Sequence, residues 1–97
     1  MQVKFTPAAE RHIDALHRLI TVQSGYESRA DGYITRIVDF CIGLETFPLR
    51  GTARDDLLEG LRIVGFEKRV TIAFMVTDDT VLIEGIYYGG QNFEADF

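Results

Sequence analysis

The spacing of hydrophobic residues changes once along the chain, and this change divides it into a helical part and a strand part. Before residue 45 the apolar residues recur at helical spacing in two separate stripes, whereas from Leu61 onward they alternate with a period of two. A pair of amphipathic helices followed by strands indicates an α+β domain with the helices packed on one side of a sheet. The first stripe is Ala9, Ile13, Leu16 and Ile20, and the second is Ala30, Ile34, Ile37, Cys41 and Leu44.

The first two elements have clear start signals. Alternation in Val3–Phe5 predicts a short strand, and Thr6–Pro7 reads as a helix N-cap followed by proline at the first helical position. For the second helix, Ser24 with Glu27 forms a capping-box pattern, and Ser28 is a rival N-cap. The link between the helices is therefore expected to be tight, which makes them a helical hairpin.

The second half is expected to form an antiparallel meander. Phe47–Pro48 ends the second helix, and an irregular connection runs to Gly60. Three strands follow in the ranges 61–66, 70–76 and 81–87, separated by short turns at Glu67–Lys68 and Asp78–Asp79. The predicted order is β-α-α-β-β-β, with the helical hairpin on a small antiparallel sheet.

The last predicted features are a second apolar sheet face and a polar tail. The central strand is apolar on both sides, so one face packs under the helices and the other is a candidate interface. The tail from Gly89 ends with two phenylalanines that look exposed, and we expect it to need a partner for order.

Length and charge exclude several classes of protein. Ninety-seven residues suit one domain, 1–97, and one cysteine forms no internal disulfide, so the cytoplasm is the expected location. No apolar run is long enough to cross a membrane, and the N-terminus lacks a signal-peptide pattern. The formal net charge is −5, with +1 in residues 1–54 and −6 in residues 55–97. Direct binding of nucleic acid needs clustered basic residues, so a protein partner is favoured.

Residue types that could carry chemistry have structural explanations. His12 and His17 lie about 140° apart on a helix, so they do not share a metal ion. Cys41 lies on an apolar stripe, as a buried small hydrophobic residue does. The adjacent acid pairs Asp55–Asp56 and Asp78–Asp79 point apart in turns. No catalytic residue, metal or cofactor is predicted.

Three residues near the sheet are the better candidates for recognition. Arg62 opens the first meander strand, where it either recognises a charged group or pairs with a loop aspartate, and the pattern favours neither. Tyr87 and Tyr88 point to opposite faces of the last strand, so one is expected in the core and the other at the surface.

Short motifs along nearly the whole chain resemble the ParE branch of the ParE/RelE superfamily, the toxins of bacterial type II toxin-antitoxin modules. The resemblance lies in the order and spacing of the motifs rather than in any one of them. The motifs are Phe5-Thr6-Pro7-Ala8-Ala9-Glu10, Phe47-Pro48, Arg50-Gly51, Arg54-Asp55-Asp56, Gly60-Leu61-Arg62 and Ile86-Tyr87-Tyr88-Gly89-Gly90.

This resemblance implies a toxin that arrests growth by binding DNA gyrase and is neutralised by a ParD-like antitoxin. The implied assembly is a heterotetramer or larger, DNA is contacted only through the antitoxin, and the antitoxin segment is expected to carry basic residues to match the acidic toxin. The alternative is a RelE-like ribosome-dependent mRNA endonuclease using Arg62 and Tyr88. Gln91 and Asn92 stand where related toxins often have arginine and aspartate, so a binding inhibitor is favoured over an enzyme. The candidate contacts for target or antitoxin are Arg54, Arg62, Tyr87, Tyr88, Gln91 and Phe93.

Overall fold

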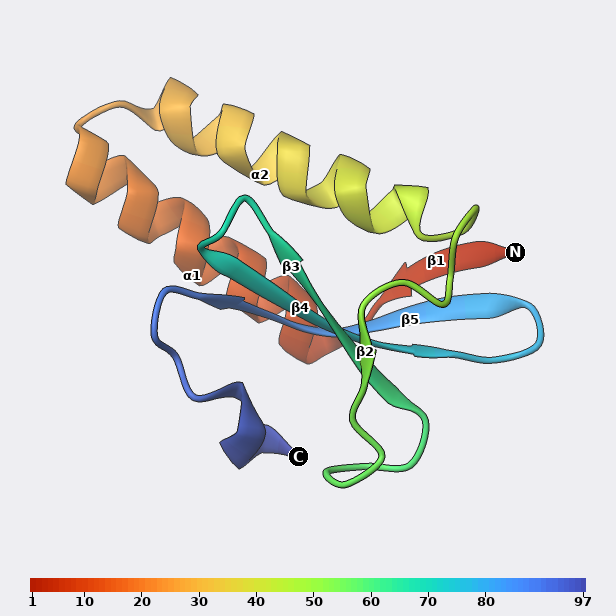
Figure 1. The fold of residues 1–97 in the computed structure, drawn as a ribbon. Coiled ribbons are helices and arrows are strands. Elements are labelled where there is room, and N and C mark those ends of the chain that lie inside the picture. The colour runs from red at the N-terminus through yellow and green to blue at the C-terminus, as the bar shows by residue number, and fades with distance from the viewer.

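Two antiparallel helices cover one face of a five-stranded sheet, and the C-terminal segment lies on the other face (Figure 1). The computed structural model describes all residues from 1 to 97. The α+β prediction and the β-α-α-β-β-β order of the main elements are confirmed. The elements are β1 (Gln2–Phe5), α1 (Pro7–Ser24), α2 (Glu27–Gly43), β2 (Thr52–Ala53), β3 (Leu61–Phe66), β4 (Val70–Val76), β5 (Thr80–Tyr88) and the 3₁₀-helix η1 (Phe93–Asp96).

The first helix begins where its sequence signals place it. The Thr6 hydroxyl accepts a hydrogen bond from the Ala9 N–H at 3.0 Å, which satisfies one of the free donors of the first turn. At the other end, Gly25 adopts φ 78° and its N–H bonds to the Thr21 carbonyl. This left-handed glycine ends α1 and lets the chain reverse within two residues.

The predicted cap of the second helix is wrong. Tyr26 occupies the N-cap position of α2 without a side-chain hydrogen bond, and neither Ser24 nor Ser28 caps the helix. Ser24 is instead the last residue of α1, and its hydroxyl accepts the Tyr26 N–H at 3.1 Å. Because Ser24 belongs to α1 and lies before the reversal at Gly25, it is not at the N-cap position, and α2 starts without a capping box.

The sheet is mixed rather than wholly antiparallel. Its order is β1-β5-β4-β3-β2, in which β3, β4 and β5 form the predicted antiparallel meander. β1 pairs with β5 in parallel. This pairing is possible because a long connection, the helical hairpin followed by β2, β3 and β4, separates the two strands in sequence. The two-residue strand β2 lies in the connection predicted to be irregular and pairs with the outer side of β3.

Apolar side chains pack on both faces of the sheet. The helix-side core contains Leu16, Ile37 and Phe74, all nearly or fully buried. On the opposite face, Leu61, Ala73 and Tyr87 form a smaller buried cluster, which η1 and the connection before β3 cover. The expectation of a tail without order is therefore corrected, because burial of its aromatic rings against this cluster stabilises η1. Neither helix has the length and apolar character needed to cross a membrane.

Candidate functional site

Arg62 holds the connection between α2 and β3. Its guanidinium donates hydrogen bonds to the carbonyl oxygens of Leu49 at 2.8 Å, Arg50 at 3.1 Å and Gly51 at 3.3 Å. The planar fork of arginine suits several carbonyls at once. The predicted pairing with a loop aspartate is wrong, because the partners of Arg62 within the chain are backbone carbonyls, whereas its recognition of an external charged group stays a prediction.

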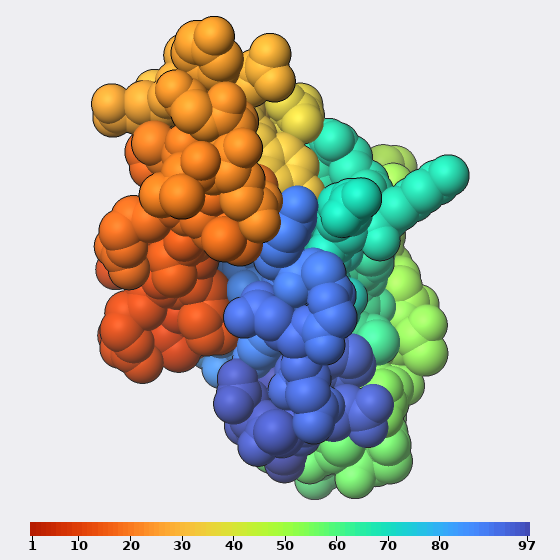
Figure 2. Space-filling model, turned by 90° about the vertical axis from the view of Figure 1, so that its left-hand side faces the viewer, coloured from red at the N-terminus to blue at the C-terminus, as the bar shows by residue number.

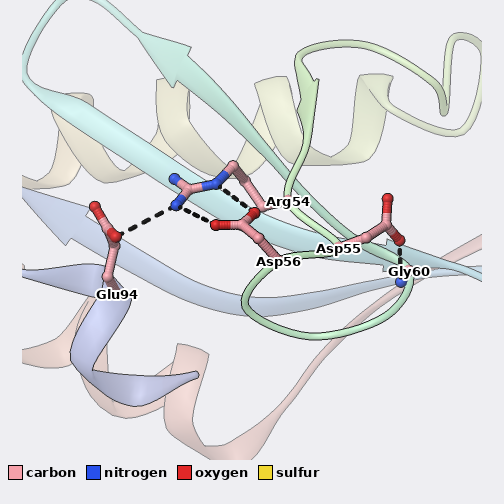
Figure 3. Close-up of polar contacts among 5 residues, drawn as sticks. All are labelled: Arg54, Asp55, Asp56, Gly60 and Glu94. Carbon is pink, nitrogen blue, oxygen red and sulfur yellow. Dashed lines mark hydrogen bonds and ion pairs between the residues drawn. The ribbon is translucent and has the colours of Figure 1, made fainter.

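Arg54 joins the same connection to the C-terminal segment (Figure 3). Its Nε and a terminal nitrogen each bond to Asp56 at 3.0 Å, and the terminal nitrogen also reaches Glu94 at 3.3 Å. The guanidinium also lies 5.7 Å from the centre of the Phe93 ring. The hydrogen bond from Arg54 lowers the pKa of the Asp56 carboxyl. We call these four residues the Arg54 clamp, and they hold η1 against the domain.

Tyr87 anchors the second face of the sheet. The side chain is 6% exposed, and its hydroxyl donates a hydrogen bond to Asp96 at 2.8 Å. Its ring contacts His12 and Phe93, with centroid distances of 5.0 and 6.0 Å. Burial, followed by the hydrogen bond to the Asp96 carboxylate, raises the pKa of the Tyr87 phenol. Tyr87 is therefore the core member of the tyrosine pair, of which the sequence predicted that one would be buried.

Tyr88 is the last residue of β5 and packs on the helix side of the sheet, opposite to Tyr87, and Gln91 follows three residues later. The Gln91 carbonyl Oε1 accepts the Tyr88 backbone N–H at 2.7 Å, which turns the chain away from the sheet. The Tyr88 ring is half-buried and meets Tyr33 of α2 edge to face at 6.2 Å. The six predicted contact residues therefore divide into three places: the loop held by Arg62, the Arg54 clamp with Tyr87, and the Tyr88–Gln91 turn.

The largest surface cavity was missed by sequence reasoning. It has a volume of about 630 Å³ and lies between the helical hairpin, the β3–β4 turn and the end of β5. Figure 2 shows these segments meeting, with the orange and yellow helices, the teal turn and the blue strand end around the cleft. We call it the arginine cleft. Its lining residues are Ile20, Ser28, Arg29, Gly32, Tyr33, Arg36, Glu67, Arg69 and Tyr88.

The charges in the arginine cleft are unevenly paired. Arg36 forms a two-bonded pair with Glu67, at 2.9 and 3.1 Å, and this lowers the pKa of the Glu67 carboxyl. Arg29 and Arg69 make no side-chain hydrogen bond or ion pair, although Arg29 lies 5.3 Å from the Tyr26 ring centre. Three arginines and one glutamate give the cleft a formal charge of +2, whereas the chain as a whole carries −5.

A helical spacing pattern contained part of the signal for this cleft. Arg29, Tyr33 and Arg36 occur at i, i+4 and i+7, so they share one face of α2. Gly32 lies beside them, and a Cβ added there would meet no heavy atom within 4 Å. The remaining cationic wall comes from Arg69 after a hairpin turn, and only the folded chain brings it to this face.

The residues assessed for metal or thiol chemistry occupy separate environments. His12 Nδ1 accepts the Ile86 N–H at 3.1 Å, while His17 Nε2 lies 2.7 Å from Asp31, so the two histidines have different partners. Glu27 approaches the His17–Asp31 pair, with all three ligand atoms within 4.8 Å, although both acids are exposed. Cys41 is fully buried, and burial raises the pKa of its thiol to about 12.

Comparison with known proteins identifies the family. The model of the ParE toxin of the type II toxin-antitoxin system parDE matches residues 3–93. A solved structure described as a chromosomal ParDE toxin-antitoxin system from P. aeruginosa superposes with a TM-score of 0.79 and 23% sequence identity, covering 92% of this chain and 96% of that chain. No curated protein sequence matches. The family match extends from β1 into η1, and the chain therefore belongs to the ParE toxin family.

Proposed function

We propose that this chain arrests bacterial growth by binding DNA gyrase stoichiometrically, and that a ParD-like antitoxin neutralises it by direct binding. The family match over residues 3–93 is the observation that carries this proposal. The target and the partner extend the family assignment, since ParE toxins are paired with an antitoxin in a two-component module.

Exposed apolar side chains support a protein partner. Val22 and Tyr26 at the end of the hairpin are 81% and 60% exposed, and Phe47 and Leu49 in the following connection are 63% and 70% exposed. Burial of such apolar side chains against a partner lowers the free energy of the complex, because it removes apolar surface from water. An antitoxin segment that follows the hairpin would cover both groups.

The geometry gives the RelE-like alternative little support. Cleavage of RNA by Arg62 and Tyr88 would require both side chains at one phosphate. Arg62 of β3 is in register with Phe74 of β4, and Phe74 is in register with Ile83 of β5. Tyr88 lies five residues farther along β5 than Ile83. At the rise of an extended strand this is a separation of roughly 17 Å. Arg62 is also engaged by three carbonyl groups.

A supercoiling assay tests the proposal directly. The purified chain is added to gyrase, ATP and relaxed plasmid, with and without the purified product of the adjacent gene. We expect inhibition that saturates near one toxin per gyrase subunit and disappears with equimolar antitoxin. Full supercoiling at excess toxin contradicts the gyrase target. New codon-specific mRNA ends in translating cells, with normal supercoiling, would instead support the endonuclease alternative.

A further inference from the structure

We propose that the arginine cleft binds a carboxylate-bearing segment of the antitoxin and seats one of its apolar side chains against Tyr33 and Tyr88. This inference rests on the proposed function, because it takes the antitoxin as the occupant. It also reverses, at this place, the expectation that the antitoxin segment is basic. The overall charge of the toxin predicts a basic partner, but the local charge of the cleft selects acidic residues.

The first argument is the state of the three guanidinium groups. Arg36 makes two hydrogen bonds to Glu67, so its charge is already compensated within the chain. Arg29 and Arg69 have no carboxylate partner and are exposed. Arginine binds carboxylates through paired hydrogen bonds, so these two side chains are the available recognition groups. Both line the same cleft with uncompensated positive charge, which a bound carboxylate would offset.

The second argument is the shape and lining of the cleft. A volume of about 630 Å³ exceeds the space needed for one side chain, and the cleft is open to solvent along the surface. Tyr33, Tyr88 and Ile20 supply apolar contact area between the charged walls. Gly32 leaves open space beside α2, because a Cβ added there would meet no heavy atom within 4 Å. An open cleft that combines apolar side chains with two unpaired arginines suits a polypeptide with alternating acidic and apolar residues.

The charge of the whole chain favours a peptide over a nucleic acid. A phosphodiester backbone needs an extended basic surface, and a protein with net charge −5 repels it beyond the cleft. A peptide places only a few carboxylates at the cleft and presents its basic residues to the acidic remainder of the toxin.

Charge reversal tests the proposal on the complete toxin with the purified product of the adjacent gene. Arg29→Glu and Arg69→Glu change the cleft, and Arg18→Glu is the control, since Arg18 is exposed on α1 and outside the cleft. Calorimetric titration should show about a tenfold loss of affinity for each cleft variant and less than a twofold loss for the control. Circular dichroism verifies that each variant folds. Arg29→Glu should fold, because it places an acidic side chain in the first turn of α2, where the helix dipole favours negative charge.

A second pair of variants at Gly32 distinguishes a cleft filled by a competing carboxylate from a cleft altered only by loss of the glycine. Gly32→Glu places a carboxylate one turn before Arg36 and fills the open space, whereas Gly32→Ala adds only a methyl group. Both replace a glycine inside a helix, so both should unfold at or above the wild-type temperature. We expect Gly32→Glu to lose about tenfold in affinity and Gly32→Ala to bind as wild type. Equal affinity of wild type, Gly32→Glu and the cleft charge reversals overturns the inference while leaving antitoxin binding intact.

A probe that does not depend on the antitoxin keeps the two proposals distinguishable. A synthetic peptide with glutamates around a leucine is titrated into ¹⁵N-labelled toxin, and the same peptide with lysines is the control. The expected result is shifted amide signals for Tyr33, Arg69 and Tyr88 with the acidic peptide only. If the antitoxin fails to bind wild type, the proposed partner is wrong, and these shifts still decide whether the cleft binds carboxylates. Stronger shifts at the same amides with a thymidine oligonucleotide would overturn the peptide assignment in favour of a nucleic acid.

Discussion

Gly85→Ala should destabilise the domain by forcing Tyr87 out of its site. Gly85 lies in β5, and a Cβ placed there would be 2.6 Å from Tyr87 Cε2 and 2.7 Å from its hydroxyl oxygen. An ordinary contact lies between 3.4 and 4 Å, so the ring must move by about 1 Å. His12 and Phe93 contact that ring, and Asp96 holds its hydroxyl, which prevents an easy shift.

The magnitude follows from three contributions. Overpacking of a buried site costs about 1 to 3 kcal/mol. Loss of the Tyr87–Asp96 hydrogen bond costs about 1 kcal/mol, and replacing a strand glycine returns about 0.5 to 1 kcal/mol. The expected net loss is about 2 kcal/mol in the free energy of unfolding. For a chain of this length that loss lowers the melting temperature by roughly 8 to 16 °C.

Urea unfolding followed by circular dichroism measures the effect. Gly65→Ala is the matched control, because its added Cβ would meet only the Val70 carbonyl oxygen at 3.9 Å. A double-mutant cycle with Tyr87→Leu isolates the clash, since the smaller side chain leaves room for the methyl group. Wild-type stability of Gly85→Ala, or additive effects in the cycle, would refute the reasoning.

Three further predictions concern Arg62, Arg54 and Cys41. Arg62→Lys should lower the free energy of unfolding by about 1 to 2 kcal/mol, since an ammonium group cannot replace the fork that holds three carbonyls; wild-type urea stability would contradict this. Arg54 holds the pKa of Asp56 below its usual 3.8, so this pair stabilises the fold above that pH and the contribution disappears as the pH falls through the lowered pKa. Arg54→Gln should therefore reduce the loss of stability below about pH 4, and an unchanged pH profile would exclude the clamp as its cause. The Cys41 thiol should not react with a maleimide at pH 8 until the protein is unfolded, because it is buried and its pKa is raised to about 12; rapid native labelling would disprove that burial.

The fold was predictable wherever a local pattern was sufficient to determine it. The stripe that contains Leu16 and the stripe that contains Ile37 both face the core, and the alternation in 70–76 corresponds to β4. The parallel pairing of β1 with β5 was not predictable, because it joins residues nearly 80 positions apart and no turn connects them. The two residues of β2 form no periodic pattern of their own and are a strand only because β3 lies beside them.

The candidate site was less predictable than the fold. Arg54, Arg62 and Tyr87 are important residues of the structure, but their polar groups bind other parts of the chain. These internal contacts show a structural role for the three side chains, and their contact with a target or an antitoxin stays a prediction. The arginine cleft shows the opposite case, since Arg69 has no distinctive sequence context and yet lines this cleft as an exposed residue.

The sequence alone therefore determined the two amphipathic helices, the three-stranded meander, the burial of Cys41 and, through motif order, the family. These properties depend on periodicity and on neighbours within a few residues, which a linear reading contains. Only the tertiary structure decided the mixed sheet, the docking of η1 on the second face and the arginine cleft. Each of these features joins segments far apart in the chain. In particular, only the folded chain shows which charged side chains have found an ion-pair partner and which have not.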